Sequence, residues 1–302
     1  MKTTLYILLV LILFSCRNYT KKEININSES YELIVPKNHK ELLILFSGFG
    51  ESNEGIKSAS KLIKSVLDEN ISVLIIKTNR NLFLNKFEKE KNAKLVWEVI
   101  NENNIQGNEI YIGGFSAGGN LALQLGKYLT FYKNGEFNPK GIFVVDSPVD
   151  LIQLYKNCKK KIKKNNSILV NESKFLLNYL NQKIGKPKEN LENYKVFSPY
   201  LDSLKYIENV KFKKTELVFN TEPALEFNRT IYNRSFEETN SFQLKNLHRE
   251  LKINGFKTSY IETKNKGYRK NGERNPHSWS IINESEIIEW IKKKTMPNTV
   301  YN

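Results

Sequence analysis

The sequence predicts an α/β protein with a mostly parallel central sheet and helices on both faces. Short apolar runs typical of buried strands alternate with helical patterns through residues 41–145. This alternation indicates a parallel sheet, because parallel neighbouring strands must be joined by crossover connections, usually helices. The 302 residues suit one large domain, and a hydrophobic share of 40% is too high for a disordered chain.

The elements follow in order along the chain. Residues 31–36 form a strand that a proline ends, because proline cannot donate to a sheet ladder. Four compact apolar runs then predict buried strands, at 41–46, 72–76, 109–113 and 141–145. Apolar residues at helical spacing predict the helices between them, at 56–67, 91–100 and 121–129.

The second half of the chain interrupts and then resumes this pattern. Residues 151–206 are rich in Lys and Asn, contain helical stretches such as 173–180, and indicate an insertion over the edge of the sheet. The alternation then returns, with strands at 215–219 and 257–263 and helices at 242–254 and 281–294. We therefore expect one domain over residues 31–302, with the insertion inside it.

The N-terminus has the pattern of an export signal. Residues 5–14 are ten consecutive apolar residues, too few for a membrane span, which needs about 20, but suitable for the core of a signal peptide. Residues 13–16 (LFSC) resemble the lipobox of bacterial lipoproteins, which implies a signal peptide over 1–15 and a lipidated Cys16. We then expect residues 16–30 to be a tether that anchors an extracytoplasmic protein to a bacterial cell membrane. An ordinary secretory signal with an incidental cysteine, or an uncleaved anchor, remains the alternative.

Charge and cysteine content exclude some classes of protein. Lys and Arg number 47 against 32 Asp and Glu, a net charge of +15, but the lysines are spread along the chain. We therefore expect no nucleic-acid partner, since such binding usually gathers basic residues on one motif. The only cysteines are Cys16 and Cys158, which excludes a disulfide framework.

A GxSxG motif carries the strongest chemical signal. Residues 114–118 (GFSAG) directly follow a predicted buried strand and open a predicted helix. In that setting a tight turn exposes the serine at the carboxyl edge of the sheet, and the small residues around it avoid collisions. Ser116 is the predicted nucleophile; a close-packed turn with a surface serine is the alternative.

These motifs resemble those of the α/β-hydrolase superfamily over nearly all of the chain after the signal. The resemblance rests on residues 47–50 (SGFG) after an early strand, on residues 114–118, and on a histidine late in the chain. It implies the α/β-hydrolase fold and the order nucleophile, acid, histidine, each after a strand. It also implies an oxyanion hole made by the backbone N–H groups of Phe49 and Ala117.

A serine nucleophile needs a base within hydrogen-bond reach, and histidine is the usual one. The chain has three histidines. His39 precedes the first core strand, and His248 lies inside a predicted amphipathic helix. His277 lies in a polar loop between the last strand and the last helix, where the resemblance places the base, so His277 is the predicted base.

The acid that orients the histidine is less strongly marked. Glu222 follows the strand predicted at 215–219 and is the first candidate, because a carboxylate there could accept the imidazole N–H. Glu226, Asp146 and Asp150 remain open as alternatives. Asp146 and Asp150 follow the preceding strand, where a minority of the superfamily places its acid.

These residues together predict a serine hydrolase that cleaves a carboxylic ester through an acyl-enzyme, acting on a small-molecule or glycan-linked ester. A peptidase or thioesterase with the same residues is one alternative. Another is a non-catalytic lipoprotein that binds an anionic glycan or partner. No metal is expected, because HExxH and paired-histidine spacings are missing from the sequence, and no cofactor is expected, because no GxGxxG follows the first strand.

Overall fold

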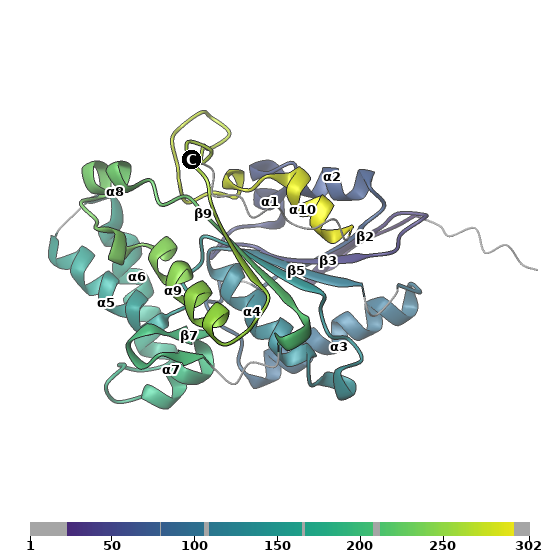
Figure 1. Ribbon diagram of the computed structural model, residues 1–302, viewed down its shortest axis with the longest axis horizontal. Coiled ribbons are helices and arrows are strands. Elements are labelled where there is room, and N and C mark those ends of the chain that lie inside the picture. The colour runs from purple at the N-terminus through teal and green to yellow at the C-terminus, as the bar shows by residue number, and fades with distance from the viewer. Residues whose placement is uncertain (1–22, 79, 106–108, 165–166, 208–211, 293–302) are drawn as a thin grey trace, which may run out of the picture.

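The computed structural model describes residues 23–292 except 79, 106–108, 165–166 and 208–211. Its centre is an eight-stranded sheet with the order β1-β2-β4-β3-β5-β6-β9-β10 (Figure 1). The strands β1 and β2 pair antiparallel, β2 pairs antiparallel with β4, and the remaining neighbours are parallel. The strands are β1 (Ile24–Asn27), β2 (Tyr31–Val35), β3 (Leu42–Phe46), β4 (Ser72–Ile76), β5 (Ile110–Phe115), β6 (Gly141–Val145), β9 (Glu216–Thr221) and β10 (Thr258–Glu262).

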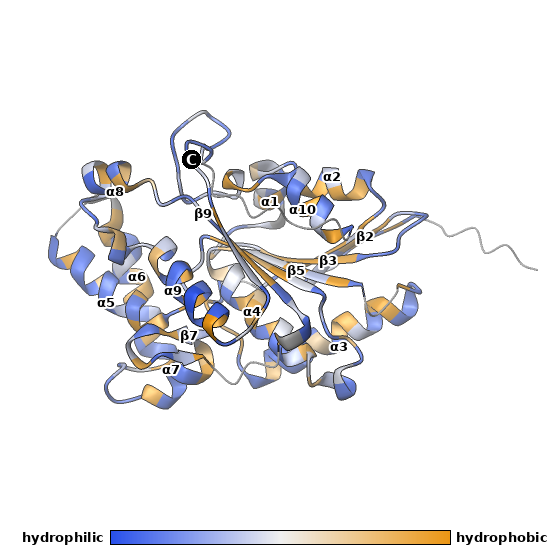
Figure 2. Ribbon diagram, in the orientation of Figure 1, coloured by the Kyte–Doolittle hydropathy of each residue, from blue (hydrophilic) through white to orange (hydrophobic). Residues whose placement is uncertain are grey.

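Helices cover both faces of the sheet. Alternate strand residues point to opposite faces, so Leu43 and Leu45 of β3 pack into one apolar cluster while Ile44 and Phe46 pack into the other. The first cluster is covered by α1 (Asn53–Ala59), α2 (Leu62–Asp68) and α10 (Glu284–Ile291). The second is covered by α3 (Lys86–Glu102), α4 (Ala117–Leu129) and α9 (Asn240–Ile253). Figure 2 shows the apolar strands between helices whose outer faces are polar.

A further layer lies at the end of the sheet where the nucleophile turn emerges. Between β6 and β9 come α5 (Leu151–Lys164), α6 (Ser167–Lys183), α7 (Leu191–Phe197), β7 (Tyr200–Leu201) and β8 (Tyr206–Ile207). Apolar residues of this insertion pack with Leu82, Phe83 and Ala117. In Figure 1 these helices and α8 (Leu225–Tyr232) gather at one end of the sheet. The insertion thus covers the turn that carries Ser116. Short 3₁₀ helices complete the chain at Tyr132–Gly135, Asp202–Leu204, Phe212–Lys214, Phe236–Glu238 and Trp279–Ile281.

Two local differences from the sequence prediction have clear causes. The strand β1 lies in residues predicted to be a tether, and it pairs with β2 as the antiparallel edge of the sheet. The single helix predicted at 56–67 is two helices, because Ser60 is extended (φ −149°, ψ 152°) and ends α1 before α2 begins. The predicted signal peptide and Cys16 lie outside the described residues. Within the described residues, no helix has both the length and the apolar character to cross a membrane.

Candidate active site

Ser116 lies on the sharp turn between β5 and α4. Its backbone has φ 53° and ψ −126°, a conformation that residues other than glycine rarely adopt. Two glycines permit the turn. A Cβ on Gly114 would lie 2.1 Å from the carbonyl oxygen of Gly118, and a Cβ on Gly118 would lie 2.3 Å from the carbonyl oxygen of Phe46. The glycine positions of GxSxG are therefore required by backbone contacts.

His277 lies next to Ser116. Its Nε2 atom is 3.1 Å from Ser116 Oγ, and its ring lies 4.7 Å, centroid to centroid, from that of Phe115. The histidine comes from the long loop between β10 and α10, far along the chain from the nucleophile turn. The structure thus brings together the serine and the histidine that the sequence pattern selects.

Asp146 lies on the other side of the imidazole. Its Oδ2 is 2.6 Å from His277 Nδ1. An ionised carboxylate only accepts hydrogen bonds, so this contact places the ring proton on Nδ1 and leaves Nε2 as the acceptor for the Ser116 hydroxyl. Asn240 donates to the Asp146 carbonyl at 3.0 Å, and the Asp146 N–H donates to Asn220 at 2.9 Å. The aspartate is therefore fixed at both the backbone and the side chain.

Glu222, the acid predicted first, does not contact His277. Its carboxylate accepts from the backbone N–H groups of Lys266 at 3.0 Å and Gly267 at 2.7 Å, and it also pairs with Arg274. Only 3% of Glu222 is exposed. The predicted contact between Glu222 and His277 is therefore wrong, because the loop that leads to His277 already supplies the hydrogen-bond donors for this carboxylate.

The other two alternatives are also placed away from the histidine. Asp150 accepts from the N–H groups of Gln153 at 2.8 Å and Asp202 at 3.0 Å, and so closes the N-terminus of α5. Burial raises the pKa of Asp150. Glu226 is exposed on α8. Of the four candidate acids, only Asp146 meets the imidazole.

One predicted oxyanion donor, Ala117, directly follows the nucleophile, and the other, Phe49, lies in a separate loop. Ala117 is the first residue of α4, so its N–H has no acceptor within the helix. Phe49 lies in the loop after β3 and lines the same cavity as Ser116. These positions suit the two backbone donors that the resemblance implies.

Glu51 is a residue that sequence reasoning missed. Its Oε2 accepts from the Gly48 N–H at 2.8 Å and from Trp279 Nε1 at 3.1 Å. It thereby ties the Phe49 loop to the segment just after His277. Burial raises the pKa of Glu51, against the lowering effect of these hydrogen bonds and of His277. A carboxylate three residues after Gly48 was a weak signal, because its partner Trp279 is distant in sequence.

A cavity of about 300 Å³ opens on Ser116 and His277. This volume is at the lower end of the range for small-molecule sites. Apolar side chains from the insertion form much of its wall, among them Leu154, Leu169 and Leu176. Substrate would therefore reach the serine between the sheet and the insertion.

No protein-family model matches the sequence, and no curated protein sequence matches it. Solved structures are nevertheless similar over most of the chain. The Francisella virulence factor BioJ superposes with a TM-score of 0.57 at 16% identity, over 90% of this chain and 84% of that one. An arylesterase gives a TM-score of 0.57 at 15% identity, over 91% and 84%. Carboxyl esterase 2 of the mycorrhizal fungus Tuber melanosporum gives 0.55 at 18% identity, over 93% and 89%.

The chain has the α/β-hydrolase fold. Within this fold, the acid that meets the histidine follows β6, and the glutamate after β9 anchors the histidine loop. The parallel order β5-β6-β9 brings the carboxyl ends of these strands to one edge of the sheet. Either strand end could therefore have supplied the acid.

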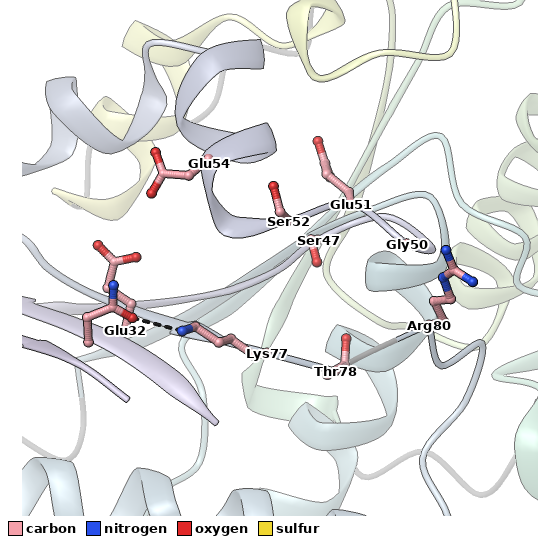
Figure 3. A pocket seen from close by; sticks show the side chains of 10 residues that line it. Glu32, Ser47, Gly50, Glu51, Ser52, Glu54, Lys77, Thr78 and Arg80 are labelled. Carbon is pink, nitrogen blue, oxygen red and sulfur yellow. Dashed lines mark hydrogen bonds between the residues drawn. The ribbon is translucent and has the colours of Figure 1, made fainter. Parts of the chain in front are cut away.

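The α/β-hydrolase fold of this chain has a second, larger cavity of about 540 Å³ beyond the Phe49 loop. Figure 3 shows its lining, which includes Glu51, Lys77 and Arg80. Ser116 and His277 are not among the residues that line it in the described part of the chain. An acyl group bonded to Ser116 would therefore occupy the smaller cavity and not this one. Among the described residues, no group of three or more His, Cys, Asp or Glu side chains is arranged to hold a metal ion.

Proposed function

We propose that this protein is a serine hydrolase that cleaves carboxylic esters through an acyl-enzyme. The observation that carries the proposal is the continuous row of hydrogen bonds from Ser116 through His277 to Asp146. A serine hydroxyl is a weak nucleophile unless a base removes its proton, and this row supplies both the base and the group that orients it. The fold similarity to esterases supports ester chemistry.

The residues divide the reaction into two halves. Ser116 Oγ attacks the acyl carbon while its proton moves to His277 Nε2, and Asp146 stabilises the imidazolium through Nδ1. The N–H groups of Phe49 and Ala117 hold the oxyanion. The tetrahedral intermediate then expels the alcohol, which takes the proton from Nε2. Water attacks the acyl-enzyme with His277 as base, and release of the acid restores Ser116.

Backbone strain at the nucleophile supports the same proposal. A serine with φ 53° is costly by about 1–3 kcal/mol, and such costs are concentrated at functional sites. A binding protein on this scaffold would have no physical need for that conformation together with the imidazole. The experiment must therefore distinguish a serine hydrolase from a non-catalytic binding protein.

A fluorophosphonate probe tests the proposal directly, because it labels only an activated serine. We expect the wild-type protein to be labelled and Ser116→Ala to be unlabelled. Ser147→Ala is a control in a serine that is buried near the end of β6, and it should retain labelling if it folds. A well-folded wild type that resists the probe and cleaves no ester would overturn the proposal in favour of a binding protein.

We propose further that the protein acts outside the cytoplasm, held to a bacterial membrane by lipid on Cys16, on a small-molecule or glycan-linked ester. The support is the apolar run at residues 5–14 and the LFSC sequence that ends at Cys16.

A further inference from the structure

Several charged side chains line the Ser116 cavity. Six acidic or strongly basic side chains besides His277 line it: Asp146, Lys161, Glu172, Arg234, Glu238 and Arg269. A small cavity must neutralise such groups internally or leave them for a ligand, because buried charges are costly without a partner. The distribution of ion pairs among the six therefore identifies the charge that is left over.

Two of the acids are already occupied. Asp146 pairs with His277 at 2.6 Å. Glu238 accepts from Lys164 at 2.8 Å and lies 3.7 Å from Lys160, so two other lysines of α5 compensate it. Glu172 is exposed on α6, where water screens it. These three carboxylates still raise the pKa of Arg234 through space, and Glu172 and Glu238 also raise that of Lys161, but in the described part of the chain none of them lies within ion-pair distance of either cation.

Arg269 is exposed and lies 3.8 Å from Glu273, which leaves Lys161 and Arg234. Both are partly buried, and no carboxylate of the described chain forms an ion pair with either of them. Burial lowers the pKa of Lys161, and the positive charge of Arg234 lowers it further. The two cations therefore act on one another through a poorly solvated space.

Both side chains are held toward the cavity by their surroundings. Leu154, Asn157 and Lys161 are spaced three and four residues apart and line the cavity from one face of α5. The Arg234 Nε donates to Asn228 Oδ1 at 2.9 Å, and the guanidinium lies 5.4 Å from the centre of the Tyr232 ring. The Nη2 also donates to Asn228 Oδ1, and within the described residues the other guanidinium N–H groups have no hydrogen-bond partner, which leaves them for a ligand.

We propose that Lys161 and Arg234 form an anion-binding subsite beside Ser116, and that the preferred esters carry a compact anionic group, a carboxylate in the first instance. This inference rests on the proposed ester hydrolysis, because it concerns the same cavity. Arginine binds a carboxylate through its planar fork and lysine as a point charge, so together they can fix one end of a substrate while the ester meets Ser116. The leucines of the cavity would contact the apolar segment between the two groups.

Matched chromogenic esters test the subsite on either side of the scissile bond. The acyl-side pair is the p-nitrophenyl half ester of adipic acid and p-nitrophenyl hexanoate. The alcohol-side pair is 4-(butyryloxy)benzoate and its benzamide. We expect wild-type kcat/KM to favour the anionic member of at least one pair by roughly tenfold or more, mainly through KM, and the preference to weaken with added salt.

Variants then assign the preference to its residue. Lys161→Gln should lose most of it and Lys161→Glu should invert it, each measured as the ratio of kcat/KM for the anionic ester to that for the neutral ester. Lys163→Gln, two residues along and exposed on the outer face of α5, is the matched control and should keep the preference. Arg234→Lys, which keeps the charge but loses the fork, should give an intermediate result.

The outcomes separate the two proposals. Hydrolysis of neutral and anionic members at equal rates in the wild type, or a preference that Lys161→Gln leaves unchanged, overturns the subsite while the esterase proposal stands. Cleavage of none of the four esters by a folded protein overturns the esterase proposal and the subsite with it.

Discussion

The two residues that hydrogen-bond to the His277 ring, Ser116 and Asp146, have backbone conformations that residues other than glycine rarely adopt. Ser116 has φ 53° and Asp146 has φ 39°, and each lies directly after a parallel strand. The strand ends are joined there, because the Ser116 N–H donates to the Val145 carbonyl at 2.8 Å. Both turns therefore lift a side chain off the edge of the sheet toward one imidazole. The strain at each is balanced by the surrounding hydrogen bonds.

The substitution Asp146→Asn, which replaces one carboxylate oxygen by an NH₂ group, tests the role of Asp146. In Asp146→Asn the side chain can donate to Nδ1, which favours the wrong histidine tautomer and removes the negative charge near the imidazolium. We expect kcat for a neutral ester to fall by about 10⁴-fold with little change in melting temperature. Glu226→Gln, on the exposed face of α8, is the matched control and should retain full activity. An Asp146→Asn rate within tenfold of the wild type would contradict the assignment.

Glu51 gives a pH prediction whose sign follows from its raised pKa. The folded state holds this proton at higher pH than the unfolded state does, so the free energy of unfolding falls as pH rises through the unfolded value of about 4.5 and on to the folded one. Relative to Glu51→Gln, the wild type should therefore gain stability as pH is lowered through that window. Urea unfolding of both proteins between pH 4 and 8 measures the difference; parallel curves would show that Glu51 is solvated.

At the scale of residues, the sequence was sufficient to select the serine and the histidine that the fold brings together, but not the carboxylate that contacts the histidine. Ser116 was marked by its glycines and His277 by its loop, both local signals. Asp146 and Glu222 each follow a strand, and only the folded loop separates them, because Arg274 and two backbone N–H groups take the Glu222 carboxylate. That loop conformation has no local signature in the sequence.

At the scale of elements, the segment between β10 and His277 depends on Glu222. Its carboxylate holds the N–H groups of Lys266 and Gly267, while Arg274 Nη1 donates back to the Gly267 carbonyl at 2.5 Å. Gly267 has no room for a side chain, since a Cβ would lie 2.4 Å from the Asn275 carbonyl oxygen. The loop is thus closed on itself around one buried carboxylate.

Glu222→Ala should destabilise the whole protein and disturb the histidine together. Removing one partner of a buried ion pair costs about 3–5 kcal/mol, so we expect a clear fall in the urea midpoint along with lower kcat. Glu222→Gln keeps an acceptor and should lose less of both. This differs from Asp146→Asn, which should lose activity alone. A Glu222→Ala protein that is inactive yet fully stable would instead assign Glu222 a direct part in the reaction.

The buried parallel strands were the elements most accessible from sequence. The strands β3, β4 and β6 are buried on both faces and fall within one residue of the predicted runs. The strand β1 was not predicted, because three of its four residues are exposed and its pairing with β2 depends on a hairpin at the sheet edge. A polar edge strand lacks the apolar signal on which the prediction depended.

On the scale of the whole molecule, the insertion forms much of the wall of the Ser116 cavity. Its helices α5 and α6 supply the wall of the Ser116 cavity and pack against Ala117. The sequence marked the insertion by its break in rhythm and by its lysines, but it could not say which lysine faced inward. Only one face of α5 lines the cavity, and the net charge of +15 says nothing about that choice.

The location of the molecule gives a prediction that is independent of its catalysis. Lipid on Cys16 would bury acyl methylenes at about 0.8 kcal/mol each, so more than one chain should hold the protein firmly to the membrane. We expect the full chain, expressed in a bacterium with lipoprotein processing, to enter the detergent phase of Triton X-114. Cys16→Ser should move it to the aqueous phase or leave the leader uncleaved. Cys158→Ala is the matched control, because this buried thiol has a pKa raised by burial to about 11 and should not be modified. Detergent partitioning of Cys16→Ser with a cleaved leader would show that something other than a lipidated cysteine binds the membrane.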